Sequence, residues 1–393
     1  MKCIIRQYKL SGGAPRSLLE HIKTLKSFGF DDITCMAIEG EKDIYSRYLD
    51  EGSHFIVRKS LSSLWVEKKY KALYEELKWE YEYIKNEAPD LVIVLGEIDG
   101  ALYSRFCYQL GIQLIIYIAG GDLSSNEEVI DLWEHCEVIC FSEENCDIIK
   151  KHFDLNHINV ISNRINITML FHDLQQKYKE PQSNINFLIS SRLDLDKTLS
   201  IYSFLNMLQT CNLDKIRINI HIAGNGTQKA ELEEYCNNIH NDNIHIKLLG
   251  HLEDLSDEFR WAHVIVGKGR SVIEPLMMNR IGCVIGDDKM QLCNTKTFDN
   301  LYHYNFSGRN IDNPNIQKDL EEVIKDIHSG SINVDEIQSV ASRTRQYYST
   351  DFLKEKVGLV LDKGLKSYPK EKHPHLLKQY LKMIIKKMQG KLK

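Results

Sequence analysis

The stretch from residue 262 to 286, AHVIVGKGRSVIEPLMMNRIGCVIG, constrains the fold more than any other part of the chain. It begins with a short apolar run at His263–Val266 and ends with another at Ile281–Ile285. Between them, Gly267–Arg270 forms a turn with two flexible backbone positions, and Ser271 is suited to the start of a helix. The pattern predicts strand, glycine turn, helix and strand. Repeated units of this kind fold into a parallel sheet covered by helices.

The turn before the predicted helix has the composition of an anion-binding site. A helix N-terminus presents unpaired N–H groups and a partial positive charge, and neighbouring glycines let the backbone approach a phosphate closely. Lys268 and Arg270 add full positive charges, and arginine can hold a phosphate through two hydrogen bonds. We therefore expect the backbone from Gly269 through Val272 to bind a diphosphate. Glu274, one turn further on, is placed to accept hydrogen bonds from sugar hydroxyls.

The same residues allow an interpretation without any ligand. Ser271 and Glu274 have the spacing of a capping box, in which the two side chains satisfy N–H groups at the helix end. Pro275 fits such a helix poorly, because it has no N–H group to close the first turn. The turn by itself leaves both interpretations open.

Length and composition indicate a globular protein with two domains. A chain of 393 residues is too long for one ordinary core, and 43% apolar and 27% charged residues are typical of soluble proteins. No apolar run approaches the roughly 20 residues of a membrane-spanning helix, and the N-terminus lacks the apolar segment of a signal peptide. The ten cysteines are scattered, and Cys136, Cys140 and Cys146 match no zinc spacing. Free thiols in a reducing cytoplasm are expected.

The charge of the chain is divided between an acidic body and a basic tail. Residues 363–393 carry +9 and the whole chain carries −5, so residues 1–362 carry −14. The acidic body argues against a nucleic-acid enzyme. The apolar residues of the tail share one helical face, with lysines on another: Leu377, Leu381, Ile384 and Met388. We expect this helix to contact the anionic inner face of the cell membrane; the alternative is that its apolar face packs on its own protein.

The first half of the chain alternates short apolar runs with helical patterns. The predicted strands are Lys2–Gln7, Ile33–Ile38, Asp90–Leu95, Gln113–Ile118, Val138–Phe141 and Asn159–Ser162. The predicted helices are Ser17–Phe28, Leu64–Asn86, Ala101–Leu110 and a segment that ends at Lys150. The alternation predicts a doubly wound parallel sheet.

After a polar linker at Asn166–Asn184 the same pattern starts again. Its strands are Asn186–Ser190, Arg217–Ala223 and His245–Leu248, and its helices are Leu199–Gln209, Gln228–Ile239 and Leu255–Ala262. We predict an α/β protein with two Rossmann-like doubly wound domains that face each other across a cleft. The predicted boundaries are 1–165 for the first domain, 166–184 for the linker, 185–344 for the second domain, 345–368 for C-terminal packing helices and 369–393 for the basic tail.

Four loops fall at strand ends, where doubly wound sheets bind their ligands. The first holds Gly12 and Gly13, which a tight turn explains equally well. The second, SSRLDLDK, places Arg192 and Lys197 where both could neutralise a diphosphate, although exposed cations often only face water. The third is Ala223–Gly226, which contains Gly224 and Asn225, and the fourth follows Gly250 and contains His251 and Leu252.

In their order and spacing, these motifs resemble the nucleotide-sugar domain of GT-B-fold glycosyltransferases, specifically the retaining family 4. SSRLDLDK resembles the loop that supplies an arginine and a lysine to the diphosphate, and IHIAGNGTQKAELE resembles the glycine loop and helix that follow. IKLLGHLEDL resembles the loop whose backbone reads the nucleotide base, near His251 and Leu252. GKGRSVIEPL resembles the diphosphate-binding helix, with Glu274 as the acid that holds the ribose. SGGAPRSLLEHI, with Gly12 and Gly13, resembles the opening loop of the first domain.

The chain departs from the family pattern at three places. The family often carries two glutamates with seven residues between them, and position 266 is Val where the first would stand. A first-domain histidine is replaced by the segment Ala119–Asp122, in which Asp122 is the nearest polar candidate for a sugar or acceptor contact and a helix cap is the alternative. Arg164 stands where an Asn-Gly pair would have glycine.

The resemblance implies transfer of a sugar from a nucleotide diphosphate, as a UDP-sugar, to a hydroxyl of a glycan or glycolipid in bacterial surface polysaccharide synthesis. It also implies that the anomeric configuration is retained. Arg192, Lys197, Gly12, Gly13 and the α-helical N–H groups would stabilise the leaving diphosphate without a metal or other cofactor. Two alternatives remain: a non-catalytic accessory subunit, and a nucleotide-sugar epimerase on the same fold.

Overall fold

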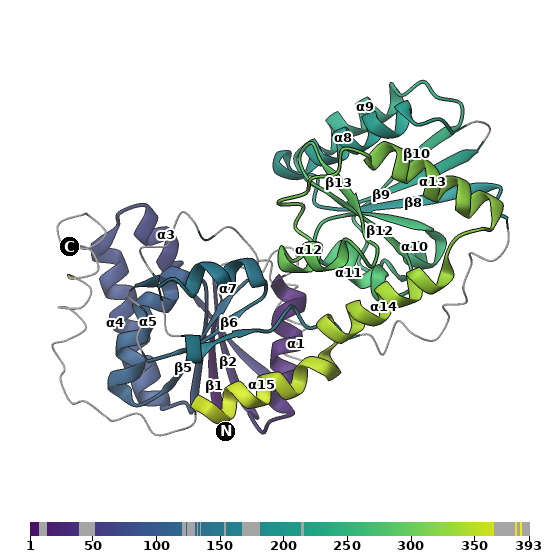
Figure 1. The fold of residues 1–393 in the computed structure, drawn as a ribbon. Helices are drawn as coiled ribbons and strands as arrows, with labels where there is room; N and C mark the ends of the chain where they lie inside the picture. The colour runs from purple at the N-terminus through teal and green to yellow at the C-terminus, as the bar shows by residue number, and fades with distance from the viewer. Residues whose placement is uncertain are drawn as a thin grey trace. The chain divides into compact units, whose positions relative to one another are not determined.

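The computed structural model describes residues 1–7, 14–38, 52–119, 123, 130–131, 133, 135–152, 155–166, 181–213, 216–364, 382 and 386. The chain forms two compact units, each with its own sheet (Figure 1). Unit 1 comprises Met1–Arg164 together with Thr350–Lys393, and unit 2 comprises Ile165–Ser349. The first unit is therefore built from both ends of the chain.

The described part of unit 1 contains a seven-stranded sheet in the order β3-β2-β1-β4-β5-β6-β7. All of its strand pairs are parallel. The strands are β1 (Lys2–Gln7), β2 (Asp32–Ile38), β3 (Ser53–Arg58), β4 (Leu91–Leu95), β5 (Gln113–Ile118), β6 (Glu137–Cys140) and β7 (Ile158–Val160). The parallel order requires crossover connections, which the helices between the strands provide.

Helices cover both faces of this sheet. They are α1 (Ala14–Lys26), α3 (Leu61–Val66), α4 (Tyr70–Glu87), α5 (Glu97–Leu110), α7 (Glu143–Ile149) and α15 (Thr350–Gly364), with a short 3-10 turn at η2 (Leu155–His157). Successive residues of β1 point to opposite faces: Ile4 packs in the core under α3, α4 and α5, whereas Cys3 and Ile5 pack in the core under α1 and α15.

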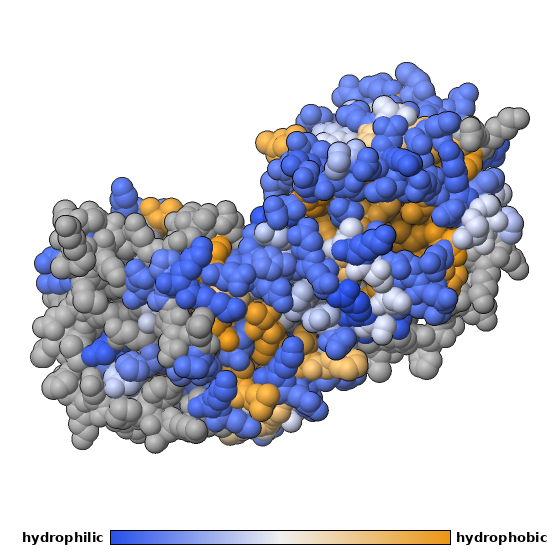
Figure 2. All heavy atoms as spheres, in the orientation of Figure 1, coloured by the Kyte–Doolittle hydropathy of each residue, from blue (hydrophilic) through white to orange (hydrophobic). Residues whose placement is uncertain are grey.

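Unit 2 contains a six-stranded sheet within its described residues, in the order β10-β9-β8-β11-β12-β13. Its strands are β8 (Asn184–Ser190), β9 (Arg217–Ala223), β10 (Ile244–Gly250), β11 (Val264–Gly267), β12 (Ile281–Ile285) and β13 (Met290–Leu292), of which only β13 pairs antiparallel. Its helices are α8 (Leu195–Thr210), α9 (Lys229–Asn237), α10 (Ser256–Trp261), α11 (Arg270–Met277), α12 (Phe298–His303), α13 (Ile316–Ser329) and α14 (Val334–Tyr348). Hydrophilic residues dominate the face of unit 2 drawn in Figure 2.

The predicted architecture, two doubly wound α/β sheets, is confirmed. One predicted helix is wrong in detail, because Leu64–Asn86 is divided between α3 and α4. The break lies at Lys68, whose left-handed φ of 58° does not fit a right-handed helix. The edge strand β3 was not predicted. The sequence of β3 does not alternate between apolar and polar residues, which is the pattern that predicts a strand. Its side chains are accordingly not buried in regular alternation.

Helix α15 returns the chain to unit 1, where it packs beside α1. Its buried residues Leu353, Val357, Val360 and Leu361 belong to the same apolar core as Leu18 and Ile22 of α1. A Cβ on Gly358 would lie 2.9 Å from the Phe28 ring, so the helix approaches closely at this point. The C-terminal helix is thus part of the first core.

A buried charged cluster lies between the unit 1 sheet and helices α4 and α5. Arg6 of β1 and Glu80 of α4 form an ion pair of 3.0 Å, and neither side chain is exposed. The Tyr103 hydroxyl also donates to Glu80. Burial raises the pKa of Glu80 to about 7 and that of Asp99 to about 6, although Arg6 acts to lower both. Buried acids of this kind make the stability of the unit depend on pH.

We expect the stability of unit 1 to fall as pH rises from about 5 to 7, with a shallower fall in a Glu80→Gln variant. The pKa of Glu80 is raised from its ordinary value of 4.5 to about 7 in the folded state, so the folded chain binds the proton more tightly. The stabilisation from this proton is complete at pH values below 4.5, the pKa of Glu80 in the unfolded chain. It is lost as pH rises through about 7, the pKa of Glu80 in the folded chain. Urea midpoints read by hydrogen exchange of β1 and β4 amides measure the slope. If stability fell with pH as steeply in the variant as in the natural chain, Glu80 would not be the source of the pH dependence. The smaller fall that we expect to remain in the variant comes from Asp99.

Candidate functional site in unit 2

The strand order of unit 2 reverses direction between β8 and β11. From β8 the chain adds β9 and β10 on one side, and then crosses to add β11 and β12 on the other. Ile189 of β8 pairs with Val266 of β11, so both strands end at the same level, at Ser190 and Gly267. The loops after these strands therefore begin side by side. Open α/β sheets bind ligands at such a switch point.

The β11–α11 turn is open on its outer side. Gly269 caps α11 with φ 60° and ψ −131°, and a Cβ placed there would meet no atom within 4 Å. The helix begins at Arg270, and Ser271 Oγ instead accepts from the Lys268 N–H at 3.2 Å and donates to the Lys268 carbonyl at 3.0 Å. The capping-box interpretation is therefore wrong, because Ser271 lies inside the helix.

The turn presents fewer unpaired N–H groups than the sequence suggests. The Gly269 N–H donates to the Phe306 carbonyl at 2.7 Å, and the Val272 N–H donates to the Gly269 carbonyl at 3.0 Å. The N–H groups of Arg270 and Ser271 belong to the first turn, where no intrahelical acceptor exists. These two amides are the ones that the helix end can offer to an anion.

The cations of this turn each contact a carboxylate. Arg270 holds Glu274 Oε1 through Nε at 2.8 Å and Nη2 at 2.7 Å, and the Lys268 ammonium lies 3.3 Å from Asp287. The remaining nitrogen of Arg270, Nη1, is buried without a hydrogen-bond partner among the described residues. The Glu274 carboxylate is buried and fixed in orientation by Arg270. Such a pair can orient an acid toward a bound hydroxyl.

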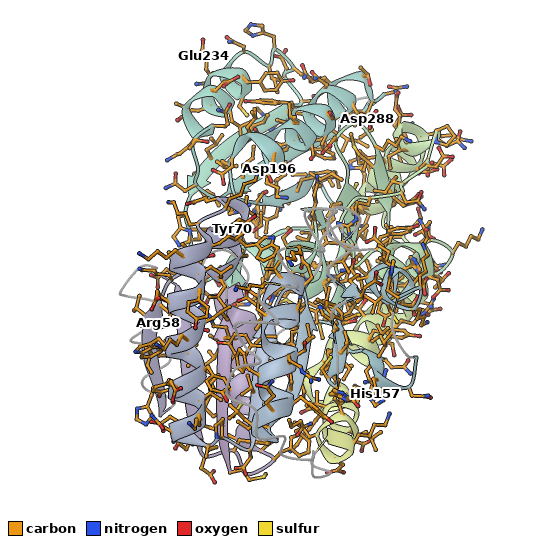
Figure 3. The ribbon with its side chains drawn as sticks, turned by 90° about the vertical axis from the view of Figure 1, so that its left-hand side faces the viewer. Arg58, Tyr70, His157, Asp196, Glu234 and Asp288 are labelled. Atoms are coloured by element: carbon orange, nitrogen blue, oxygen red, sulfur yellow. The ribbon has the colours of Figure 1, made fainter. Side chains whose placement is uncertain are left out.

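The loop between β8 and α8 also pairs its own charges. Arg192 lies 3.0 Å from Asp194 and 4.0 Å from Asp196, and Lys197 lies 3.2 Å from Asp196, which is labelled in Figure 3. The Asp196 pKa is lowered overall: its limited burial acts to raise it, but Lys197 and Arg192 outweigh that effect. More than half of the Arg192 and Asp196 side chains is exposed. Exposed pairs contribute only about 0–1 kcal/mol, so a diphosphate can replace the carboxylates.

Gly224 and Gly226 allow two loops to pack backbone against backbone. A Cβ on Gly224 would overlap the Ser191 carbonyl, and one on Gly226 would overlap the backbone of Leu193. The Leu193 N–H donates to the Asn225 carbonyl at 2.9 Å. In this structure the glycine motif holds the β8–α8 loop in place.

The loop after β10 joins the same set. The Gly224 N–H donates to the Gly250 carbonyl at 2.7 Å, and His251 and Leu252 follow directly, with His251 exposed. The structure therefore brings the second, third and fourth predicted loops and the β11–α11 turn to one edge of the unit 2 sheet. Four adjacent strands supply them.

Three predicted site residues, Gly12, Gly13 and Asp122, lie outside the described residues. The basic tail does too, apart from Lys382 and Lys386. Arg164 is buried, with its guanidinium 5.7 Å from the centre of the Tyr117 ring, and its nitrogens find no hydrogen-bond partner within the described part of the chain.

Two features of the site were not predicted from sequence. The carboxylates Asp194 and Asp196 alternate with the cations in RLDLDK, and their spacing could have revealed the pairing. A cavity next to Lys268, formed with residues 286–289 and 307–312, had no local sequence signal. Within the described ranges, no group of histidine, cysteine or acidic side chains has the arrangement of a metal site, and no helix could cross a membrane.

No protein-family model matches the chain, and no curated protein is similar enough to match. Solved structures are similar over almost the whole length. A glycosyltransferase from Rickettsia africae has a TM-score of 0.67 at 17% identity, covering 93% of this chain and 99% of its own. Anabaena HepE in complex with UDP and glucose has a TM-score of 0.64 at 12% sequence identity, and the match covers 92% of this chain and 100% of HepE. The lipopolysaccharide outer core galactosyltransferase WaaB has a TM-score of 0.63 at 13% sequence identity, and the match covers 92% of this chain and 99% of WaaB. The fold is that of GT-B glycosyltransferases.

Proposed function

We propose that the chain is a glycosyltransferase that takes a sugar from a nucleotide diphosphate, most simply a UDP-sugar, to a hydroxyl of a glycan or glycolipid. One observation carries the proposal. Arg192, Lys197 and the turn that leads to Glu274 all flank the switch point between β8 and β11, at the same edge of the sheet. A GT-B-like fold with UDP bound in HepE supports the nucleotide.

In the proposed reaction, the bond between the anomeric carbon and the diphosphate oxygen breaks, and negative charge develops on the diphosphate. The acceptor oxygen bonds to the anomeric carbon, and its proton passes to the leaving diphosphate. Arg192 and Lys197 would exchange their exposed carboxylate partners for phosphate oxygens, and the N–H groups of Arg270 and Ser271 would donate to them. Glu274, held by Arg270, would accept from the ribose hydroxyls. The family resemblance adds retention of configuration. The proposal assigns charge stabilisation to these groups rather than to a divalent ion.

The non-catalytic alternative has one observation in its favour. Each of Arg192, Lys197, Lys268 and Arg270 contacts a carboxylate of its own chain, as it would in a protein that binds no diphosphate. The ion pairs of Arg192 and Lys197 with these carboxylates are exposed and therefore weak, so a diphosphate can replace the carboxylates. Turnover distinguishes the two functions. The purified chain should release UDP from a matching UDP-sugar when an acceptor glycan is present, at a rate that a chelator does not change.

Glu274→Gln should weaken UDP binding by roughly 10-fold or more, because the variant loses a charged hydrogen-bond acceptor for the ribose. The sharper readout is the ratio of the Kd values of UDP and 2′-deoxy-UDP, measured by calorimetry. This ratio should be large for the natural chain and close to one for the variant. Asp257→Asn, an exposed carboxylate on α10 that pairs with Arg260, is the matched control. An equal ratio in the natural chain and the variant would remove Glu274 from the ribose site.

We also propose that the basic tail, residues 369–393, holds the enzyme at an anionic membrane surface where lipid-linked acceptors of surface polysaccharides are found. Its support is the sequence pattern of apolar and lysine faces. Sedimentation with anionic vesicles compares the full chain with one that ends at Pro369, and equal binding would exclude this role.

A further inference from the structure

Unit 2 carries a cavity of about 500 Å³ on the β12 side of the β11–α11 turn. Three segments line it: Lys268 of the turn, residues 286–289 after β12, and residues 307–312 after α12. Asp288 of the second segment is labelled in Figure 3. The volume lies within the range of about 300–1,000 Å³ that is usual for small-molecule sites. Lys268 belongs to the β11–α11 turn assigned above to the diphosphate. The other residues assigned above to the diphosphate or the ribose do not line this cavity.

The backbone is left-handed at the two residues just before the third segment and at one residue within it. Asn305, Phe306 and Asn310 have φ of 50°, 52° and 52°. Asparagine enters this left-handed region readily, but at Phe306 it costs roughly 1–3 kcal/mol. The surroundings hold the strain: Phe306 is buried against Phe298 and Tyr348, and Asn305 accepts from the Tyr348 hydroxyl at 3.1 Å. Strain of this kind persists where the surrounding structure fixes it, and it is concentrated at binding sites.

Close backbone contacts join the segments into one wall. The Phe306 carbonyl accepts from Gly269, which ties the strained segment to the N-terminus of α11. A Cβ on Gly286 would lie 2.8 Å from the Gly308 carbonyl, and one on Gly308 would overlap the Ile285 carbonyl. The cavity is therefore shaped before any ligand arrives, and it adjoins the turn where the diphosphate is proposed to bind.

The lining selects for a particular chemistry. It holds three cations, Lys268, Lys289 and Arg309, and three carboxylates, Asp287, Asp288 and Asp312, so its formal charge is zero. Lys268 and Asp287 pair with each other at 3.3 Å. An anion would meet as many carboxylates as cations, and an apolar ligand would have to remove water from six charges. A neutral ligand with many hydroxyls can donate to the carboxylates and accept from the cations.

We propose that this cavity binds a neutral pyranose through Asp288, Asp312 and Lys289. The sugar is either the one carried by the nucleotide donor, in which case the inference rests on the function proposed above, or a sugar of the acceptor. Both sources present a neutral ring with several hydroxyls. Asp288, Lys289 and Asp312 line the cavity with exposed side chains, so their polar atoms are available to a ligand.

The test compares the natural chain with an Asp288→Asn/Asp312→Asn variant by calorimetry. The probes are UDP, three UDP-sugars (glucose, galactose and N-acetylglucosamine), the methyl glycosides of these sugars, and methyl glucuronide as an anionic sugar. The control variant is Asp242→Asn/Asp257→Asn, which removes two exposed charges from the same unit away from the cavity. UDP affinity should be equal in all three proteins. The loss of two charged hydrogen bonds should weaken sugar binding by roughly 10- to 100-fold in the cavity variant alone.

The results also identify the source of the sugar. Weaker binding of a UDP-sugar points to the donor, and weaker binding of a methyl glycoside with UDP-sugar affinity unchanged points to the acceptor. No loss for any sugar probe in the cavity variant would overturn the proposal, as would tighter binding of methyl glucuronide than of methyl glucoside. Failure of the proposed function looks different, because UDP would then not bind the natural chain, whereas methyl glycosides would still report on the cavity.

Discussion

Arg192→Ala should lower kcat/KM for the nucleotide sugar by roughly 10- to 100-fold, the usual effect of removing a charged hydrogen bond. Arg192 follows the carboxyl end of β8, where its side chain is more than half exposed and pairs with Asp194 and Asp196. The loss should appear in the affinity for UDP and be smaller for uridine, which has no phosphate to hold. Calorimetry with both probes measures it.

Arg217→Ala is the matched control for this prediction. Arg217 is an exposed arginine on the neighbouring strand, at its amino end and therefore at the opposite edge of the sheet. Its removal changes the net charge equally and should leave UDP affinity within about twofold. If both variants lost the same affinity, or if uridine and UDP lost equally, a diphosphate contact by Arg192 would be excluded.

Gly224→Val should destabilise unit 2 by about 3 kcal/mol or more and abolish nucleotide binding. Any side chain at this position overlaps the Ser191 carbonyl, so the β8–α8 loop that carries Arg192 must move. The urea midpoint of unit 2, read from hydrogen exchange of β8 and β9 amides, measures the effect on stability.

Gly269→Ala provides the comparison, because a Cβ at Gly269 meets no atom within 4 Å and the cost is limited to its φ of 60°. With its ψ of −131°, this conformation lies in a region that is nearly restricted to glycine, and it costs an alanine roughly 1–3 kcal/mol. Equal destabilisation by the two substitutions would show that loop packing at Gly224 is not the source of the larger loss.

The buried strands could be predicted closely from the sequence. Lys2–Gln7, Gln113–Ile118, Arg217–Ala223 and Ile281–Ile285 were predicted with the bounds that the structure shows, because a strand buried in a parallel sheet is a short apolar run between polar turns. The strand β13 escaped prediction because three residues give no periodicity. The return of α15 to unit 1 depends on contacts with residues more than three hundred positions earlier, which no local pattern encodes.

The candidate site was predictable in its positions and less so in its contacts. Strand ends give the location of Arg192, Lys197 and the β11–α11 turn, because parallel strands end at one edge. The pairing of Arg270 with Glu274 follows a helical spacing of four and could have been read from the sequence. The cavity could not, since it depends on left-handed backbone at Asn305 and Phe306 and on contacts between distant loops. The roles of Gly12, Gly13 and Asp122 stay predictions.

The division of unit 1 between the two ends of the chain affects how the protein is made. Unit 2 is continuous in sequence, so a nascent chain can complete its sheet while translation continues. The side of unit 1 formed by Leu18, Ile22 and Leu25 cannot be covered until residues 350–364 have left the ribosome. The part of the protein that is synthesised first is therefore the last to finish folding, and a premature stop after Ser349 would damage the amino-terminal core rather than the domain next to the stop.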